Sequence, residues 1–387
     1  MSRSAAHDQL PIIPLLILAM AAFVTIVTEA LPAGLLTQFA LGLNISESLA
    51  GQSITIYAVG SLLTAIPLTN LSQNIRRKPL LLIALLGFAL TNLITTLSSS
   101  YLLTMIARFL AGVSAGLLWA LLAGYATRMA PEALKGRAIA IAMIGTPLAL
   151  SLGVPAGTYL GQMLGWRMAF AVMSIFAIML VLWGWVALPD FDGQATDQKV
   201  SLKQVFILPG VRAILFTVLS FVLAHNLLYT YIVPFLSLAD LTQHINIILL
   251  IFGCLSLFSI FITAMLIDQH LRLLTLCSII LFGFAALLLN IMGHHAPAVY
   301  LAVGIWGIAF GGAATLFQTA LAKTTDHMAD IAQSMLVTVW NIAIAGGGII
   351  GGFLLSYFSV STFPIALLIL LLMTFMVVWR AKPYGFC

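Results

Sequence analysis

Charged residues are scarce in this chain. Asp, Glu, Lys and Arg together make up 7% of its 387 residues, whereas ordinary globular domains carry roughly 25%. Hydrophobic residues make up 62%, and the mean hydropathy is +1.14. A soluble protein of this size could not cover its surface with so few charges, but a surface that faces lipid needs none. The composition therefore excludes an ordinary soluble domain and predicts a membrane protein.

Sequence signatures of metal, cofactor and nucleic-acid sites are also missing. The three cysteines, Cys254, Cys277 and Cys387, have neither metal-ligand spacing nor a disulfide framework. The sequence has no glycine-rich phosphate loop ending in lysine, and no nucleophile beside a base. The net charge of +5 comes without the basic and aromatic surface that binds nucleic acid. These absences argue against an enzyme, a metal, an organic cofactor and a nucleic-acid partner.

Long apolar runs are the main feature that is present. A helix needs about 20 residues to cross roughly 30 Å of hydrocarbon, and twelve runs fit that length. They are 12–36, 50–71, 79–97, 102–127, 136–160, 167–188, 211–236, 245–266, 271–292, 298–320, 331–356 and 362–380. The runs lack the alternation of membrane β-barrel strands, and a helix satisfies its own backbone hydrogen bonds in lipid. The sequence predicts an all-α membrane protein with twelve transmembrane helices.

The Lys and Arg residues divide unequally between the two sides of this topology. Of the 16 basic residues, Arg167 lies in a loop on one side and Arg108 lies inside a span. The remaining 14 lie on the other side, which the positive-inside rule makes the cytoplasm. Both termini are then cytoplasmic, which requires an even number of spans. We expect a monomeric, multi-pass protein in the lipid bilayer of a bacterial inner membrane.

A hydrophilic break divides the spans into six and six. It predicts an N-terminal bundle over 1–190, a cytoplasmic linker over 191–210 and a C-terminal bundle over 211–387. Small residues recur at corresponding spans of the two halves. In the fourth and tenth spans they are Gly112 and Gly116, and Gly304, Gly307, Gly311 and Gly312; in the fifth and eleventh they are Gly145, Gly153, Pro155, Gly157 and Gly161, and Gly346, Gly347, Gly348, Gly351 and Gly352. Such residues allow close helix packing, and two pseudo-symmetric halves are a recurrent transporter plan.

Glu29 and Arg108 are the charged residues well inside predicted spans. At about 1.5 Å per residue, both lie about 10 Å below the outer interface, so a pair between them is possible. A carboxylate at this depth is costly and usually faces protein or water, which makes Glu29 a candidate proton carrier. Arg108 keeps its proton and can only bias such a carboxylate. The alternative is a purely structural ion pair.

Polar and aromatic side chains inside the spans are candidates for lining a substrate cavity. They are Tyr57, Trp119, His225, Asn226, Tyr229, Gln318, Trp340 and Asn341. Aromatic and amide groups suit an amphipathic organic substrate, and a histidine can titrate near neutral pH. Each residue can equally well serve helix packing. The set predicts a small-molecule substrate without naming it.

Three stretches resemble the major facilitator superfamily. They are Arg108-Phe109-Leu110-Ala111-Gly112 with Gly116; Gly145 through Gly153-Val154-Pro155-Ala156-Gly157, followed by Gly161 and Gly165-Trp166-Arg167; and Thr28-Glu29-Ala30-Leu31-Pro32-Ala33-Gly34-Leu35. The first is similar to a motif tied to proton coupling, and the second to the fifth-span motif of antiporters. The third resembles the start of sugar-efflux permeases. The chain is thus similar, along nearly its whole length, to twelve-span drug:proton antiporters and most of all to bacterial sugar (arabinose) efflux permeases.

The loop between the second and third spans departs from the superfamily pattern. Its basic cluster is Arg76, Arg77 and Lys78. Thr69 and Gln73 stand where the family usually has a glycine and an aspartate. The corresponding loop of the second half keeps Asp268 and Arg272. In the family the charged residues of this loop are linked to gating between conformations. The departure puts that gating interaction in doubt for this chain and leaves the predicted fold unaffected.

The residues and the resemblance together imply a transporter. We expect two six-helix bundles that rock around a central cavity and export a small organic compound, a sugar or a drug, in exchange for protons. Protons would be the coupling ion, with no other cofactor. The first alternative is an importer or uniporter without proton coupling. The second is a membrane receptor on the same fold that binds without transporting.

Overall fold

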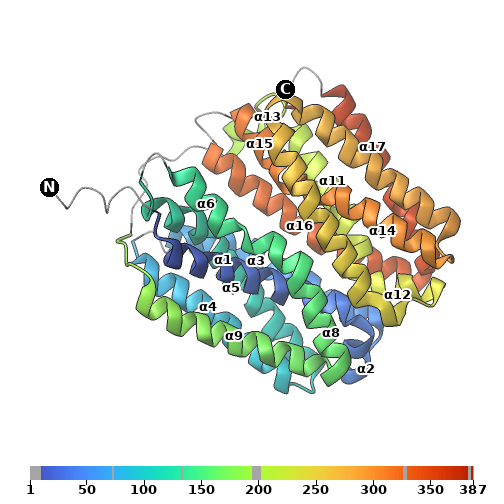
Figure 1. Ribbon diagram of the computed structural model, residues 1–387, viewed down its shortest axis with the longest axis horizontal. Coiled ribbons are helices and arrows are strands. Elements are labelled where there is room, and N and C mark those ends of the chain that lie inside the picture. Colours follow the sequence, from blue (N-terminus) through green and yellow to red (C-terminus); the bar gives the residue numbers. More distant parts are fainter. Residues whose placement is uncertain are drawn as a thin grey trace.

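The computed structural model describes residues 10–71, 74–131, 134–193, 202–325, 329–381 and 385–386. Throughout these ranges the regular elements are helices, and no strand occurs in them. Helices that precede residue 193 gather on one side of the molecule and helices that follow residue 202 on the other (Figure 1). The all-α class predicted from the sequence is confirmed.

The first group contains the predicted spans one to six. Its helices are α1 (Ile12–Gly34), α2 (Leu36–Leu43), α3 (Glu47–Leu71), α4 (Arg77–Leu97), α5 (Tyr101–Arg128), α6 (Lys135–Met143), α7 (Gly145–Leu148), η2 (Ala149–Gly153), α8 (Val154–Leu164) and α9 (Trp166–Ala187). The fifth span is assembled from α6, α7, η2 and α8, and η2 is a π-helix of five residues. Helix α2 lies beyond the first span.

The second group contains the remaining six predicted spans. Its elements are α10 (Leu202–Phe206), α11 (Val211–Thr230), α12 (Ile232–Leu236), η3 (Ser237–Ala239), η4 (Thr242–His244), α13 (Ile245–Met292), α14 (Ala296–Gly311), α15 (Ala313–Thr325), α16 (Ala329–Tyr357), η6 (Val360–Thr362) and α17 (Phe363–Arg380). Helix α13 runs through 48 residues with a kink at His270 (φ −129°, ψ 27°). The kink divides α13 into two candidate membrane spans, Thr242–Ile267 and Gln269–Met292, which match the predicted spans eight and nine. A short non-helical break at His270, rather than an extended loop, connects them.

Eleven helices in the described ranges are long and apolar enough to cross a membrane. The remaining predicted span is α3, whose 25 residues pack against α5 in the first group and α16 in the second. Large apolar side chains such as Trp185, Val186 and Phe261 are exposed on the outside of the molecule. Exposed apolar surface on this scale fits lipid rather than water. The chain is therefore a multi-pass membrane protein.

Glycines bring corresponding helices into contact in both groups. A β-carbon at Gly112 on α5 would collide with the backbone oxygen of Tyr57 on α3. A β-carbon at Gly307 on α14 would lie 2.6 Å from the backbone oxygen of Phe252 on α13. The fourth span thus packs on the second as the tenth packs on the eighth, at a distance that only glycine permits. This equivalence explains why small residues recur in the two halves.

Replacing Gly112 with Ala is expected to destabilise the protein by about 1–3 kcal/mol, because the added methyl group overpacks a contact with backbone rather than with a flexible side chain. Gly124 on the same helix is a matched control, since nothing lies within 4 Å of its β-carbon position. Thermal unfolding of both variants in detergent measures the difference. Equal melting temperatures for Gly112→Ala and Gly124→Ala would contradict the packing argument.

Candidate functional site

A proline inside α1 leaves a backbone carbonyl without a helical partner in the first bundle. Pro32 has no N–H, so the Thr28 carbonyl four residues earlier lacks its usual helical partner. Arg108 on α5 supplies the replacement: its Nη1 donates to the Thr28 oxygen at 2.6 Å, and its Nη2 to the Glu29 backbone oxygen at 3.2 Å. Its Nε donates to the backbone oxygen of Ser53 at 3.3 Å. Arg108 therefore joins α5 to α1 and α3.

Aromatic rings complete the surroundings of the Arg108 guanidinium. Its central carbon lies 4.9 Å from the ring centre of Tyr57 and 5.9 Å from that of Phe170, and such cation–π contacts are favourable when desolvated. The Tyr57 hydroxyl donates to the Thr25 carbonyl on α1 at 3.1 Å. Tyr57 therefore covers the Arg108 guanidinium and forms a further hydrogen bond, which connects α3 to α1.

The side chains of Glu29 and Arg108 do not form the ion pair that their similar depth made possible. In the described ranges the ion pairs closer than 4.0 Å join Arg76 to Asp190 and Asp192. Arg108 instead holds the backbone of Glu29 and acts on the carboxylate electrostatically from a longer distance. The carboxylate is therefore left free to exchange other partners.

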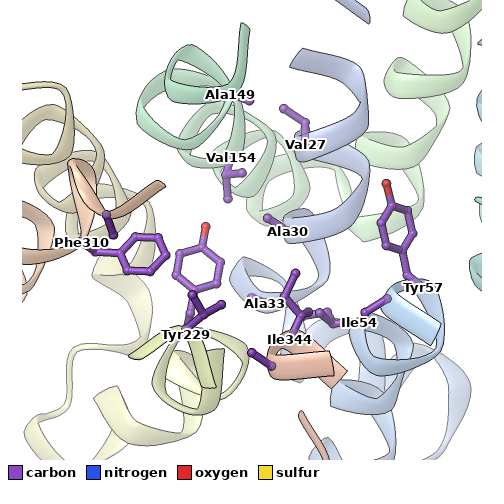
Figure 2. Close-up of a cluster of buried hydrophobic side chains, with 14 of the residues drawn as sticks. Val27, Ala30, Ala33, Ile54, Tyr57, Ala149, Val154, Tyr229, Phe310 and Ile344 are labelled. Carbon is purple, nitrogen blue, oxygen red and sulfur yellow. The ribbon is translucent and has the colours of Figure 1, made fainter. Parts of the chain in front are cut away.

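Glu29 faces the second bundle. Its side chain is partly exposed, although Thr28 and Ala30 beside it are buried. Its helix, α1, contacts α11, the helix of the second bundle that carries Tyr229. Figure 2 shows the Tyr229 ring pointing its oxygen toward Ala30 of α1 and Val154 of α8. Glu29 thus lies on a helix at the meeting of the two bundles and is itself half-buried.

Five rings in the second bundle form a cluster that we call the aromatic box: His225, Tyr229, Phe252, Trp306 and Phe310. The His225 ring stacks on Phe310 with centres 3.5 Å apart and planes 6° apart. The centres of Tyr229 and Trp306 each lie 5.2 Å from that of His225, and Phe252 lies 4.6 Å from Trp306. The spacing of the sequence indicated His225 and Tyr229 but missed the other three, which come from α13 and α14. Trp306 stands beside the glycines of the tenth span, and this was the one signal available for it.

Two nitrogen atoms of the aromatic box are buried without a partner. They are Nδ1 of His225 and Nε1 of Trp306. Buried polar groups in proteins are normally hydrogen-bonded, so each such atom needs an explanation. The aromatic box therefore has apolar ring faces and two buried nitrogen atoms that lack a hydrogen-bond partner.

The remaining cavity candidates behave differently from one another. The amides of Asn226 and Asn341 donate to their own helices, to the Val222 and Val337 oxygens, each at 2.9 Å. The Trp340 ring lies 6.2 Å from Phe310, so it borders the aromatic box. Of the other two, Trp119 is half-buried on α5 and Gln318 is exposed on α15.

The glycine- and proline-rich fifth span packs along α1, the helix that carries Glu29. Three of its glycines face α1 side chains: Gly153 faces Phe23 and Val27, Gly157 faces Leu31, and Gly161 faces Leu35. Gly145 lies against the backbone of Ala19. Pro155 follows the π-helix η2, at whose centre Ser151 touches the position of a β-carbon on Gly253 of α13. This span therefore packs both on α1 and on α13 of the second bundle, and α1 itself also contacts α11, α12 and α13. Gly116 is buried in the neighbouring α5.

The basic cluster after the second span binds the segment that follows α9. Arg76 Nε lies 2.8 Å from Asp190 Oδ2, and the Lys78 amide donates to Asp190 Oδ1 at 3.1 Å. The Arg77 amide donates to the Phe191 oxygen at 2.8 Å. Asp190 thus supplies a carboxylate at the start of α4, where a helix N-terminus favours negative charge.

The other members of the loop prediction are placed only in part. Gln73 and the side chains of Thr69 and Asp268 lie outside the described part of the structure. Arg272 Nη2 donates to the Trp379 carbonyl at 2.8 Å, which ties α13 to α17. The gating role of these loops stays a prediction.

Hydrogen bonds close the two bundles together at the end where α2 meets α12. The Tyr231 hydroxyl lies 2.8 Å from the Gly348 oxygen and 3.3 Å from the Ser48 oxygen. Gln52 Nε2 donates to Tyr231 at 3.2 Å and to the Gly348 oxygen at 3.0 Å. Ser48 Oγ donates to the Gly352 oxygen at 3.0 Å. We call this set the clamp; it joins α3 to α16 at the end opposite the two termini in Figure 1.

Replacing Tyr231 with Phe is expected to loosen the clamp, because it removes the hydroxyl shared by three partners. One lost hydrogen bond contributes about 0.5–1.5 kcal/mol, so the population open at this end should rise up to about tenfold. A cysteine at buried Ala33, with the native cysteines replaced by serine, should then react faster with a membrane-impermeant maleimide. Tyr357→Phe on exposed α16 surface is the control. An unchanged labelling rate in Tyr231→Phe would contradict this role of the clamp.

The fold and the interface between bundles can now be compared with known proteins. Residues 18–345 match the Major Facilitator Superfamily, which is most of the chain. The chain belongs to this superfamily. Members of the superfamily are membrane transporters rather than enzymes, so the predicted absence of catalytic chemistry agrees with the family.

Two relatives match over most of the chain. The transcription regulatory protein OpdE of Pseudomonas aeruginosa is 29% identical over 378 residues, which cover 95% of this chain and 93% of OpdE. The purine ribonucleoside efflux pump NepI of Salmonella enteritidis is 27% identical over 344 residues, which cover 88% of this chain and 86% of NepI. The superfamily member described here is thus similar to an efflux pump.

Two solved structures share the fold. A bacterial homologue of the human lysosomal transporter Spinster, in an inward-facing and occupied conformation, aligns with a TM-score of 0.76 at 13% identity and covers 96% of both chains. The human organic anion transporter MFSD10 (TETRAN) aligns with a TM-score of 0.65 at 16% identity and covers 95% of this chain and 99% of that one. These similarities establish the superfamily fold and carry no information on substrate.

Proposed function

We propose that this superfamily member exports a small organic compound across the inner membrane in exchange for protons. The observation that carries the proposal is the placement of Glu29: its backbone is held by Arg108, and the residue is half-buried on a helix where the bundles meet. A carboxylate that can take up and release a proton there would respond to movement of the bundles. Both termini would be cytoplasmic and the protein monomeric, as the sequence predicts.

Coupling requires that the proton and the substrate prefer different states or compete for the same one. A ligand shifts a conformational equilibrium only through its different affinities for the two states. Glu29 is charged or neutral depending on its proton, whereas Arg108 stays charged. A nearby positive charge such as Arg108 favours the charged form of a carboxylate, and apolar surroundings favour the neutral form. Opening of the clamp at one end and closure at the other would alternate these surroundings.

The proposed direction of transport and the proposed substrate class rest on similarity to efflux proteins as well as on the residues of this chain. NepI is named for the efflux of purine ribonucleosides, and the sequence resembles sugar-efflux permeases. Aromatic side chains at the bundle interface suit an organic molecule with an apolar face. A sugar, a nucleoside or another drug-sized compound is the proposed substrate class.

The alternatives of the sequence analysis remain distinct proposals. An importer or uniporter would use the same fold without a proton step. A receptor without transport gains one observation in its favour, because OpdE is named as a transcription regulatory protein. It predicts ligand binding with no flux into or out of vesicles.

Substrate-triggered proton release tests the export proposal directly. Purified protein in weakly buffered detergent solution is mixed with adenosine, with arabinose and with tetraphenylphosphonium, and the pH is recorded. Antiport through Glu29 predicts proton release by wild type on addition of a substrate and none by Glu29→Gln. Binding without proton release in either protein would favour the uniporter or the receptor, which a flux assay in vesicles then separates.

A further inference from the structure

The unpartnered nitrogens of the aromatic box define which hydrogen-bonding groups a ligand bound there must have. The indole N–H of Trp306 only donates, whereas Nδ1 of His225 donates or accepts according to its tautomer. The two side chains are 0% and 5% exposed, and their ring centres lie 5.2 Å apart. A ligand that satisfies both atoms must present at least one hydrogen-bond acceptor, with a second polar atom a few ångströms from it.

The ring faces of the aromatic box favour a flat ligand. His225 and Phe310 stack in parallel, with planes 6° apart, and Trp306 stacks on Phe282 with planes 15° apart. Flat rings stack well on such faces, as nucleic-acid bases do on aromatic side chains. A planar heterocycle can therefore stack on one of these rings in place of the side chain that stacks on it now.

The charges near the aromatic box argue against a cationic ligand. In the described part of the chain, the ion pairs found do not include His225. Glu29 lies across the interface on α1, which contacts α11. A buried cation without a counter-charge is costly. A free sugar is disfavoured for another reason: it has a hydroxyl on nearly every carbon, and the box offers only two unpartnered nitrogens.

We propose that the aromatic box binds an uncharged, flat nitrogen heterocycle, of which the base of a nucleoside is an example. This assignment rests on the proposed transport function and specifies its substrate class. In Figure 2 the Tyr229 ring lies between Phe310 and the small side chains Ala30 and Ala33 of α1. A heterocycle seated against His225 and Trp306 would thus leave any attached group between the bundles, beside Glu29.

Equilibrium binding tests the assignment without any proton gradient. Full-length protein in detergent is dialysed against radiolabelled adenosine, with unlabelled arabinose and tetraphenylphosphonium as competitors. His225→Phe and Trp306→Phe keep a ring and remove the polar atoms. Each should weaken adenosine binding about tenfold or more, because a site built to hydrogen-bond its ligand discriminates strongly against the missing partner. Trp379→Phe, on the exposed face of α17, should bind like wild type.

A ligand-side change makes the test sharper. Benzimidazole riboside keeps the fused ring system and the sugar but lacks the two nitrogens of the six-membered ring and the amino group attached to it. It should bind wild type more weakly than adenosine does, and the difference between the two ligands should shrink in His225→Phe or Trp306→Phe. Melting temperatures of the variants verify that they are folded.

The outcomes separate this assignment from the transport proposal. Absence of adenosine binding by folded wild type, or adenosine binding unchanged in both box variants, would overturn the assignment. Proton release triggered by arabinose or the cation alone would overturn it too, while leaving proton coupling intact. Adenosine binding that depends on the box, without proton release, would support the assignment and count against the antiport.

Discussion

Replacing Glu29 with Gln is expected to abolish pH-driven transport in vesicles, down to the rate of protein-free liposomes. Glutamine keeps the size of the side chain and cannot carry a proton. Because Arg108 binds the backbone of Glu29 and not its carboxylate, the substitution leaves the hydrogen bonds of Arg108 in place. Exchange of labelled for unlabelled substrate without a gradient should therefore persist in Glu29→Gln, which separates lost coupling from lost folding.

Glu47 provides a matched control for this experiment. It begins α3 and accepts a hydrogen bond from Thr37 on α2, so its carboxylate already has a partner within the first bundle. Glu47→Gln should keep pH-driven transport close to that of wild type. Full retention of pH-driven transport by Glu29→Gln would remove Glu29 from the mechanism, and loss in both variants would show that the effect is not specific to the site.

Replacing Arg108 with Met is expected to lower the free energy of unfolding by about 1–3 kcal/mol, the usual cost of leaving a buried polar group without a partner. The loss arises at the Thr28 carbonyl, which has no helical partner because Pro32 lacks an N–H and which Arg108 no longer binds in the variant. Removal of a buried charge also removes a desolvation cost, so the loss is smaller than three charged hydrogen bonds would suggest. Thermal and denaturant unfolding in detergent measure it. Arg76→Met, at an exposed arginine, should change the stability little.

A double-mutant cycle isolates the cause. Pro32→Ala restores an N–H to the Thr28 carbonyl, so Arg108→Met should destabilise the Pro32→Ala protein less than it destabilises wild type. Residues that share a partner are expected to couple in this way. Additive losses would show that Arg108 acts on α1 by some other route than the freed carbonyl.

The depth of Glu29 and Arg108 in their spans could be predicted from the sequence, but their contact could not. Counting residues places both side chains at a similar level, and the structure does bring α5 against α1 there. Pro32 was part of the stretch that resembles efflux permeases. Only the three-dimensional packing shows that it frees a carbonyl for Arg108, because that hydrogen bond joins residues 80 positions apart.

Three rings of the aromatic box and the clamp escaped prediction for the same physical reason. Phe252, Trp306 and Phe310 are ordinary members of apolar helices, and nothing in a hydropathy pattern separates them from rings that face lipid. Gln52 and Tyr231 are isolated polar residues that lie 179 positions apart in the sequence. Their roles arise when the two bundles meet, which local sequence patterns do not encode.

The sequence alone determined the membrane setting, the all-α class and the family, because lipid imposes length and hydrophobicity on each span independently of its neighbours. It also determined which spans have close neighbours, since glycine is needed wherever backbones touch. The tertiary structure decided which helix each glycine faces, which carbonyl Arg108 satisfies and which nitrogens remain without a partner. Those features depend on the relative positions of distant helices, and such positions follow from packing of the whole chain rather than from any one segment.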